Sequence, residues 1–260
     1  MIHIVPHVRL RHGVDMRYST LLLALFPQTA LAELPAPVTD ADYPPIVKQE
    51  AVLGRDLFYD PILSGNLNVA CATCHNPAFG TSDGLSLGIG DGGIGLGTSR
   101  VIDPENLPEA RVPRNSPALF NLGAYEFTRL FHDGRIEVDA DRPNGIRTPL
   151  ADDMVAGFAS LLSAQTMFPV LSPDEMAGHY AENDVSKAVR QGLLTGPGGA
   201  WDIIAKRVAA VPEYADRFAK AYPDRPEIAF TDIANALAAF MAWEWRSDTS
   251  LFDEVLRGQA

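Results

Sequence analysis

Helical periodicity dominates the spacing of apolar residues along this chain. Apolar positions recur every three or four residues, as on one face of an amphipathic helix, while strict alternation of apolar and polar residues is nearly absent. Six segments show the helical spacing: 46–59, 151–164, 185–194, 200–210, 212–221 and 233–245. The pattern therefore predicts an all-α fold in which long irregular loops connect the helices.

Residues that start and stop helices support several of these bounds. Asp60 and Pro61 end the first segment, and Pro212 lies in the first turn of its helix, where a missing N–H group costs no hydrogen bond. Thr231 or Asp232 is the expected N-cap of the last helix, because either side chain can accept a hydrogen bond from a free backbone N–H. These signals predict where three of the helices begin or end.

A glycine-rich stretch separates the first helix from the others. Gly80–Gly97 contains eight glycines in eighteen positions, which excludes a packed helix and a regular strand. Irregular segments of this length are usually functional or mobile. We therefore expect a functional or mobile loop here.

The N-terminal residues have the pattern of an export signal. A basic residue, Arg17, precedes the apolar run Leu21–Phe26, and Ala30–Ala32 forms a small-x-small cleavage site. We expect cleavage after Ala32, with Met16 as the true initiator, and a periplasmic location for the mature protein. The expected organisation is an extension and signal peptide (1–32), a Pro-rich linker (33–45) and one domain (46–260).

Composition narrows the function classes. The chain has 260 residues, 47% hydrophobic and 21% charged, as in a globular protein, and its formal net charge is -12. An acidic surface repels a phosphate backbone, so nucleic acid is not an expected partner. No apolar run approaches the roughly 18 to 20 residues that span a bilayer, so we expect no membrane span after signal cleavage.

The candidate chemistry lies in the sequence CATCH, which contains the chain's two cysteines. In the motif Cys71-x-x-Cys74-His75, the two thiols can form thioether bonds to haem vinyl groups while the imidazole ligates the iron. The alternatives are a zinc site, which would need nearly every Cys and His of the mature chain, a redox dithiol and a strained disulfide. The export signal favours covalent haem c, because bacteria attach this cofactor outside the cytoplasm.

The second axial position of the iron decides between an electron carrier and an enzyme. A carrier fills that position, often with methionine, and Met154, Met167 and Met176 are available. An enzyme leaves it open beside an acid–base group, for which His132, His179 or a carboxylate would serve. The residues alone leave both possibilities open.

Several motifs, in order, resemble the bacterial di-haem cytochrome c peroxidases and their MauG-type relatives, specifically the N-terminal half that carries the peroxidatic haem. The similarity extends from about Leu53 to Leu256. The motifs are LGRDLFYDPILSGN, CATCHNPAFGTSDGL, RNSPALFN, FHDGR, SPDEM, VPEYADRFAKAYP and the segment ending LFDEVLRG. The resemblance implies a cytochrome c-like haem domain.

The resemblance also implies roles for individual residues. His75 corresponds to the proximal ligand of the peroxidatic haem iron, and Glu175 in SPDEM to the distal acid–base glutamate. Gln165 and Pro169 match the glutamine and proline of the distal pocket. Asn115 matches a ligand of the calcium ion held between the two haem domains of the family. The implied cofactors are one covalent haem c and calcium.

The implied function is a periplasmic haem peroxidase domain that reduces hydrogen peroxide. Its electrons would come from a small cytochrome or cupredoxin, or from a second haem domain or haem protein. Two alternatives remain: a mono-haem electron-transfer cytochrome c, and a MauG-like oxidase of protein side chains.

This sequence departs from the family pattern in several places. Asp83–Arg100 contains no histidine, although many relatives carry one there that blocks the iron, so we expect an open iron in the resting state. His132 replaces a tryptophan, and Glu137–Ser160 looks like an insertion that reshapes the pocket entrance. Relatives continue beyond the position of Ala260 into a second haem domain. We therefore expect either a fragment or a domain that works with a partner haem protein.

Overall fold

The computed structural model describes residues 34–142 and 144–259. It divides the chain into two units, residues 1–35 and residues 36–260. The predicted signal peptide, with its cleavage site after Ala32, lies outside the described residues. The fold below is that of the second unit.

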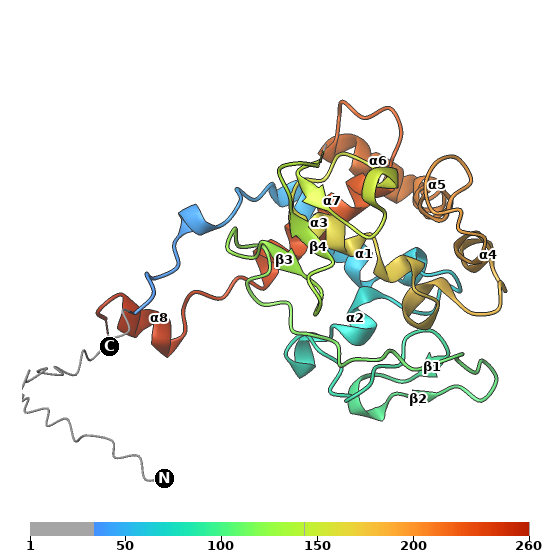
Figure 1. Ribbon diagram of the computed structural model, residues 1–260, viewed down its shortest axis with the longest axis horizontal. Helices are drawn as coiled ribbons and strands as arrows, with labels where there is room; N and C mark the ends of the chain where they lie inside the picture. Colours follow the sequence, from blue (N-terminus) through green and yellow to red (C-terminus); the bar gives the residue numbers. More distant parts are fainter. Residues whose placement is uncertain (1–33, 143, 260) are drawn as a thin grey trace, which may run out of the picture. The chain divides into compact units, whose positions relative to one another are not determined.

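Helices make up most of the regular structure in this unit (Figure 1). The α-helices are α1 (Lys48–Tyr59), α2 (Cys71–Cys74), α3 (Leu161–Thr166), α4 (Asp184–Arg190), α5 (Ala200–Ala209), α6 (Pro212–Ala221), α7 (Phe230–Glu244) and α8 (Leu251–Leu256). Short 3₁₀ turns lie at Asp40–Asp42, Pro61–Leu63, Pro77–Phe79, Gly97–Ser99, Ala151–Asp153 and Pro169–Leu171, and a π-helical turn at Pro173–Ala177.

The prediction of an all-α fold is wrong, because two small antiparallel sheets occur among the described residues. The strands are β1 (Gly93–Ile94), β2 (Val101–Ile102), β3 (Arg129–Leu130), β4 (Ile136–Val138) and β5 (Ile146–Arg147). β1 pairs with β2, and β4 lies between β3 and β5. Strands of two or three residues are too short for apolar and polar alternation to be visible in the sequence.

The core forms where α1 crosses α7. A Cβ atom added to Gly54 of α1 would lie 1.8 Å from the backbone oxygen of Ala236 in α7, so only glycine permits this approach. Beside the crossing, the rings of Phe58, Phe240 and Trp245 pack together with centroids 5.0 to 5.4 Å apart. Aromatic rings in this range of distances add to the stability that burial provides. The α1–α7 pair is therefore the base on which the other elements pack.

The predicted helices are confirmed at α1, α4, α5, α6 and α7, with ends that differ by up to four residues. The helix predicted over 151–164 is wrong in its first half: the α-helix begins only at Leu161, where the Ser160 hydroxyl accepts a hydrogen bond from the Ser163 N–H. Neither Thr231 nor Asp232 is the N-cap of α7, which begins at Phe230. Asp232 instead lies in the first turn, and its carboxylate accepts from the Ala229 N–H at 2.9 Å.

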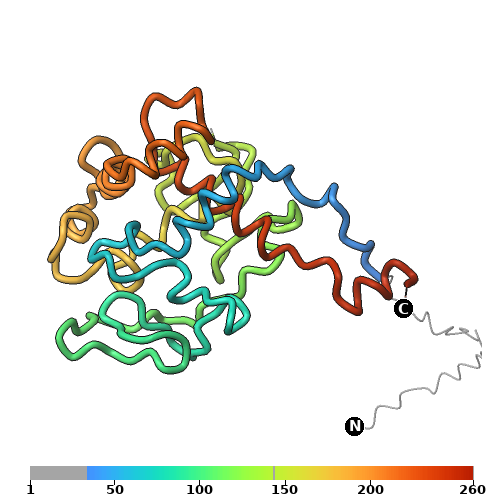
Figure 2. Tube along the Cα trace, turned by 180° about the vertical axis from the view of Figure 1, so that it is seen from behind, coloured from blue at the N-terminus to red at the C-terminus, as the bar shows by residue number. Residues whose placement is uncertain are grey.

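The two ends of this unit run side by side, away from the helical body (Figures 1 and 2). The Arg246 guanidinium pairs with Asp40 at 2.7 Å and lies over the Tyr43 ring, 4.4 Å from its centroid. Nearer the tip, Arg257 donates to the backbone oxygen of Val38 at 3.2 Å. These contacts tie the predicted linker (33–45) to the segment before and after α8.

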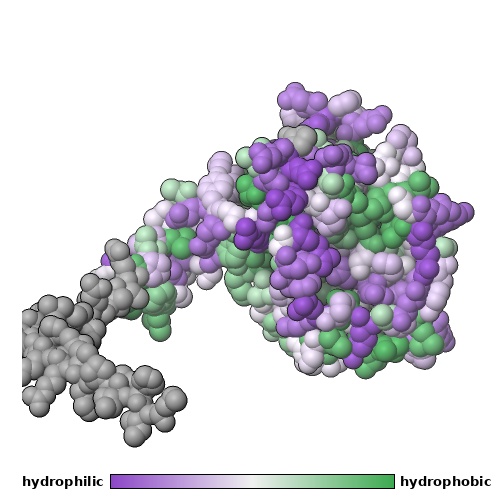
Figure 3. All heavy atoms as spheres, viewed as in Figure 1, coloured by the Kyte–Doolittle hydropathy of each residue, from purple (hydrophilic) through white to green (hydrophobic). Residues whose placement is uncertain are grey.

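Part of the glycine-rich loop forms an apolar projection. The β1–β2 ribbon carries four exposed apolar side chains: Ile94, Leu96, Val101 and Ile102. Apolar atoms appear along the lower edge of the body, where the ribbon is drawn (Figure 3). Among the residues that the structure describes, no helix is both long enough and apolar enough to cross a membrane.

Candidate functional site

The two cysteines lie on a single helical turn. α2 consists of Cys71–Cys74 alone, and it is closed by a 2.9 Å hydrogen bond from the His75 N–H to the Cys71 carbonyl. At its start, the Ala70 N–H donates to the Thr73 hydroxyl at 3.0 Å. Side chains three residues apart on a helix share one face, so both sulfurs point to the same side of the turn. This arrangement suits attachment along one edge of a porphyrin.

Burial keeps both thiols protonated. It raises the pKa of Cys71 to about 12, with the neighbouring Cys74 adding to the effect, and the pKa of Cys74 to about 11. A reactive redox dithiol needs a thiolate, which a lowered pKa provides. The environment therefore disfavours the redox-dithiol alternative.

Two neighbours orient the His75 ring. Its Nδ1 atom lies 3.0 Å from the backbone oxygen of Thr81 and 3.1 Å from the Ser116 hydroxyl. A carbonyl can only accept, so Nδ1 carries the proton and Nε2 carries the lone pair, with the Ser116 hydroxyl 3.4 Å away from it. Burial lowers the pKa of His75 and so favours the neutral ring, which is the form that binds metals. The ring is therefore prepared to ligate through Nε2.

Thr81 holds an unfavourable backbone conformation to reach His75. Its φ of 61° is in the left-handed region, which β-branched residues avoid. Its N–H donates to the Asn76 carbonyl, and its hydroxyl accepts from the Leu119 N–H at 2.8 Å. These bonds fix the loop in its strained form. Neither Thr81 nor Ser116 was predicted as a site residue, although Ser116 lies in the RNSPALFN motif.

Glu175 lies in the π-helical turn Pro173–Ala177, close to the cysteine turn. Burial raises the pKa of its carboxyl, the Ser172 hydrogen bond and the Arg135 charge lower it, and Asp174 raises it further. The charge of Glu175 in turn raises the pKa of Cys74. The Cys74 sulfur lies 4.0 Å from the Ile89 carbonyl oxygen, and the next residue, Gly90, packs against the Glu175 backbone, so the glycine-rich loop connects the CATCH and SPDEM segments. A carboxyl with a raised pKa suits general acid–base chemistry.

Gln165 and Pro169 lie in α3 and in the 3₁₀ turn that follows it. Gln165 is half-buried near the end of that helix, and Pro169 begins the 3₁₀ turn that packs on the Glu175 turn. Between them, the Phe168 ring meets Phe131 of FHDGR with centroids 6.3 Å apart. The Trp201 indole N–H donates to the Met167 carbonyl at 2.8 Å and so ties the residues between Gln165 and Pro169 to α5. The structure thus places Pro169 on a turn that packs on the Glu175 turn, and Gln165 four residues earlier, near the end of α3.

Asn115 is exposed, and its side-chain oxygen accepts a hydrogen bond from the Ser82 hydroxyl at 3.0 Å. Within residues 34–142 and 144–259, no group of three or more His, Cys, Asp or Glu side chains could hold a metal ion. The role of Asn115 as a calcium ligand stays a prediction.

The other sequence candidates lie in different settings. His132 is exposed, so it does not pack in the core, whereas Met167 and Met176 are core residues. The segment predicted to be an insertion, Glu137–Ser160, contains most of β4 and all of β5. These two strands pair with each other, with Glu137 opposite Arg147. The insertion is thus a structured hairpin.

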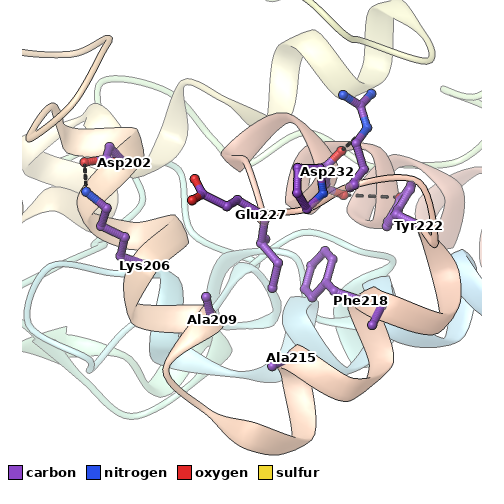
Figure 4. Close-up of a pocket in the computed structure, with 12 residues that line it drawn as sticks. Asp202, Lys206, Ala209, Ala215, Phe218, Tyr222, Glu227 and Asp232 are labelled. Atoms are coloured by element: carbon purple, nitrogen blue, oxygen red, sulfur yellow. Dashed lines mark hydrogen bonds and ion pairs between the residues drawn. The ribbon is translucent and has the colours of Figure 1, made fainter.

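A cavity of about 380 Å³ lies between α5, α6 and the start of α7 (Figure 4). Its walls carry a Lys206–Asp202 ion pair of 2.8 Å and a hydrogen bond from the Tyr222 hydroxyl to the Asp232 backbone oxygen. All of its lining residues fall between positions 202 and 232, so it contains none of the predicted site residues. It is separate from the cysteine turn.

The di-haem cytochrome c peroxidase family model matches residues 48–260, which include the cysteine turn, His75 and Glu175. The chain belongs to this family. It is 31% identical over 92% of its length to the methylamine utilization protein MauG of Paracoccus denitrificans, and 29% over 75% to that of Methylorubrum extorquens. It is 28% identical over 86% of its length to the cytochrome c551 peroxidase of Pseudomonas aeruginosa.

Membership of the di-haem cytochrome c peroxidase family implies a c-type haem. The matched regions cover 50%, 38% and 47% of those three relatives, so the chain spans about half or less of their length. The residues present fit the cofactor: two protonated thiols share one helical face, and the adjacent imidazole has its Nδ1 proton engaged, which leaves the lone pair on Nε2.

Proposed function

We propose that residues 46–260 form a periplasmic c-type haem peroxidase domain that reduces hydrogen peroxide to water. The observation that carries this proposal is that Glu175, a carboxyl whose pKa is raised by burial, packs against Gly90, the neighbour of Ile89, whose carbonyl oxygen lies 4.0 Å from the Cys74 sulfur. The peroxidase name of the Pseudomonas aeruginosa relative supports it. In this proposal residues 1–32 are removed on export.

Cys71 and Cys74 would hold one haem c covalently, and His75 would ligate its iron through Nε2. When bound, the haem supplies the electron-transfer chemistry that no side chain of this chain can provide. Thr81 and Ser116 keep the ring oriented through their contacts with Nδ1. A metal-ligating histidine commonly donates its second N–H in this way, which increases its basicity as a ligand.

Glu175 would move the proton. Reduction of peroxide to two waters consumes two protons and two electrons, and the leaving oxygen must be protonated as the O–O bond breaks. Glu175 as a carboxylate takes a proton from the nearer oxygen and, as the acid, returns it to the leaving oxygen. Its raised pKa brings the carboxylic acid and the carboxylate closer in free energy near neutral pH. The positive charge of Arg135 acts in the opposite direction and stabilises the carboxylate.

Gln165 and Pro169 would shape the space in which peroxide binds. A Gln side-chain amide both donates and accepts, so it can orient peroxide or the product water relative to Glu175. Pro169 has no N–H group and leaves one fewer donor to compete for peroxide. Phe131 and Phe168, packed edge to face beside them, reduce the access of bulk water.

Glu175→Gln tests the proposal, because the amide keeps the shape of the carboxyl but cannot exchange a proton. We expect haem attachment to be unchanged and peroxide turnover to fall by about 100-fold or more, the usual contribution of an acid–base group. Asp174→Asn is the matched control, since it removes a neighbouring charge from the same turn. Undiminished turnover in Glu175→Gln would remove Glu175 from the mechanism.

The electrons would come from a small cytochrome or cupredoxin, or from a second haem domain or haem protein. Removal of residues 1–32 takes away three arginines and one aspartate and changes the formal net charge from -12 to -14, which favours a basic donor through electrostatic steering. Oxidation of a reduced basic cytochrome in step with peroxide consumption would support this. Faster oxidation of an acidic cytochrome would contradict it.

A second candidate is a MauG-like oxidase of protein side chains, favoured by the match to Paracoccus denitrificans MauG over 92% of this chain. It would use the same pocket and the same Glu175. The two functions differ in their reductant. If peroxide is consumed only when a substrate protein is present whose side chain is oxidised, and a reduced cytochrome is not oxidised, the result would favour the oxidase.

A further inference from the structure

We propose that Asp91 is a positioning residue that holds Glu175 in place relative to the cysteine turn, and that His179 fixes Asp91 in that role. The inference rests on the proposed function of Glu175. Asp91 and His179 lie outside every motif to which the resemblance assigns a role in this pocket, and both side chains are fully buried.

The backbone of Asp91 is bonded directly to Glu175. The Asp91 N–H donates to the Glu175 carbonyl at 3.0 Å. The neighbouring residue must be glycine, because a Cβ atom on Gly90 would lie 2.3 to 2.6 Å from the backbone of Asp174 and Glu175. The glycine-rich loop therefore lies flush against the Glu175 turn.

The side chain of Asp91 is bonded to the segment that leads into α2. Its Oδ1 accepts from the Asn68 amide at 2.5 Å, and its Oδ2 accepts from the Asn66 amide at 2.8 Å. In the same segment, the Gly65 N–H donates to the Met176 carbonyl at 2.7 Å. Asp91 thus joins the Glu175 backbone to a segment that reaches Cys71 three residues after Asn68.

The His179 ring also contacts Asp91. Its Nε2 lies 3.4 Å from the backbone oxygen of Asp91 and 3.6 Å from Oδ2, while its Nδ1 has no hydrogen-bond partner within the described part of the chain. An unpaired N–H is costlier to bury than an unpaired lone pair, so the proton lies on Nε2, facing Asp91. The backbone N–H of His179 donates to the Glu182 carboxylate at 2.8 Å.

The contacts of Asp91 require an acceptor at both oxygens. Asp91→Asn keeps the shape but removes the negative charge and turns one oxygen into an NH₂ group that faces the Asn68 amide, so the hydrogen bonds to a charged carboxylate are lost. Exchanging the pair, as Asp91→Asn with Asn68→Asp, restores the match: the amide at 91 donates to the new carboxylate and its oxygen still accepts from Asn66. The exchange also preserves net charge, which makes it a sharp test.

The experiment uses the full-length, haem-loaded ferric protein. It measures peroxide turnover, the rate of cyanide binding, which needs a base to take the proton of HCN, and amide hydrogen exchange of residues 174–178. We expect Asp91→Asn to slow both rates by about 10- to 100-fold, as displacement of a reacting group does, and to speed exchange at the Glu175 turn. The double exchange should return both rates to within a few-fold of wild type.

A second pair tests His179. Gln places a donor near the position of Nε2, whereas Phe fills the space without one, so His179→Gln should stay close to wild type and His179→Phe should be slowed like Asp91→Asn. These variants keep the test available if Asp91→Asn folds poorly. Equal rates for the Gln and Phe variants would overturn the role given to His179.

Asp232→Asn is the control for general destabilisation. Asp232 is also buried and its carboxylate also accepts a hydrogen bond, from the Ala229 N–H, but it lies at the start of α7 in the wall of the cavity of Figure 4. It should lower the unfolding temperature and leave both rates unchanged. Equal slowing in Asp232→Asn, unchanged rates in Asp91→Asn, or no recovery in the double exchange would each overturn the proposal.

The failure of this inference is distinguishable from the failure of the proposed function. If Glu175→Gln retains full turnover, the role of Glu175 is wrong. If Glu175→Gln is inactive while Asp91→Asn behaves as wild type, Glu175 acts without Asp91, and only the positioning role fails.

Discussion

The backbone oxygen of Thr81 lies 3.0 Å from Nδ1 of His75, although the two residues are separated by the 3₁₀ turn Pro77–Phe79. The chain returns to the imidazole only because Thr81 adopts a positive φ, at a cost of roughly 1 to 3 kcal/mol for a strained residue. Strain of this kind persists where the surrounding structure requires it. Here the result is a fixed tautomer, with the proton on Nδ1 and the lone pair on Nε2.

Ser116→Ala should raise the reduction potential of the haem iron. The Ser116 hydroxyl shares the Nδ1 proton with Thr81, at 3.1 Å, and a hydrogen bond at that atom increases the electron density that the ligand gives the metal. Its loss makes His75 a weaker donor and favours the ferrous state. A spectroelectrochemical titration of the purified protein measures the change in potential.

Ser86→Ala is the control for that substitution, because Ser86 is an exposed hydroxyl of the adjoining loop. It should leave the potential unchanged. A potential in Ser116→Ala that equals wild type, or that moves downward, would show that the hydroxyl does not act on the imidazole.

Glu175→Gln should stabilise the folded protein at pH 7 and lose that advantage in acid. Burial raises the pKa of Glu175 above its unfolded value, so the folded state binds this proton more tightly. Stability from this group is therefore present below the unfolded pKa and falls as pH rises through the folded pKa. The neutral amide avoids that loss of stability, because it carries no charge to bury at any pH.

Urea unfolding of wild type and Glu175→Gln at pH 7 and at pH 4 measures this effect. The difference in the free energy of unfolding should be larger at pH 7. Glu213→Gln, at an exposed position in the first turn of α6, should show no such dependence. A greater advantage for Glu175→Gln at pH 4 would mean that the carboxylate is stabilised by the fold.

Periodicity predicted the helices that pack by an apolar face. α6 has the bounds of the predicted segment 212–221, since Pro212 at its start and the buried Tyr214 and Phe218 on one face are visible in the sequence. α3 was misplaced because the spacing over 151–164 is that of a helix, whereas only its last part packs in the core. The side chain of Ser160, a local start signal, decides where the helix begins.

The site was predictable only where chemistry follows from adjacent residues. Cys71, Cys74 and His75 form a contiguous motif, so their proximity needs no knowledge of the fold. Thr81 contributes a backbone oxygen, which any residue has. Asp91 bonds to Asn66 from a glycine-rich loop, and glycines allow so many backbone conformations that the sequence does not predict the path of this loop. Contacts of this kind depend on the path of the chain and leave no periodic pattern.

Gly54→Ala should destabilise the protein by about 3 kcal/mol, the upper end of the range for overpacking a core. The added methyl group would overlap the Ala236 backbone, which cannot move without displacing α7. Gly192→Ala offers a comparison, because its Cβ meets open space and only its φ of 71° opposes the change. It should cost about 1 kcal/mol, the penalty of the left-handed conformation. Equal unfolding midpoints for the two variants in urea would contradict the close approach of α1 and α7.

The ferric protein should be high-spin as isolated, without prior reduction. The resemblance to the family implies that a blocking histidine lies in the loop after the cysteine turn, and Asp83–Arg100 contains no histidine. The buried Arg100 guanidinium also fixes this loop, donating to the backbone oxygens of Ile89 at 2.6 Å and Gly95 at 2.8 Å. A loop held in this way has neither the ligand nor the freedom to cover the iron. Electron paramagnetic resonance and visible spectra of the untreated protein should show a high-spin or water-bound haem, and cyanide should bind before any reductant is added. A low-spin bis-histidine spectrum that becomes high-spin only after reduction would show that a histidine outside this loop blocks the site.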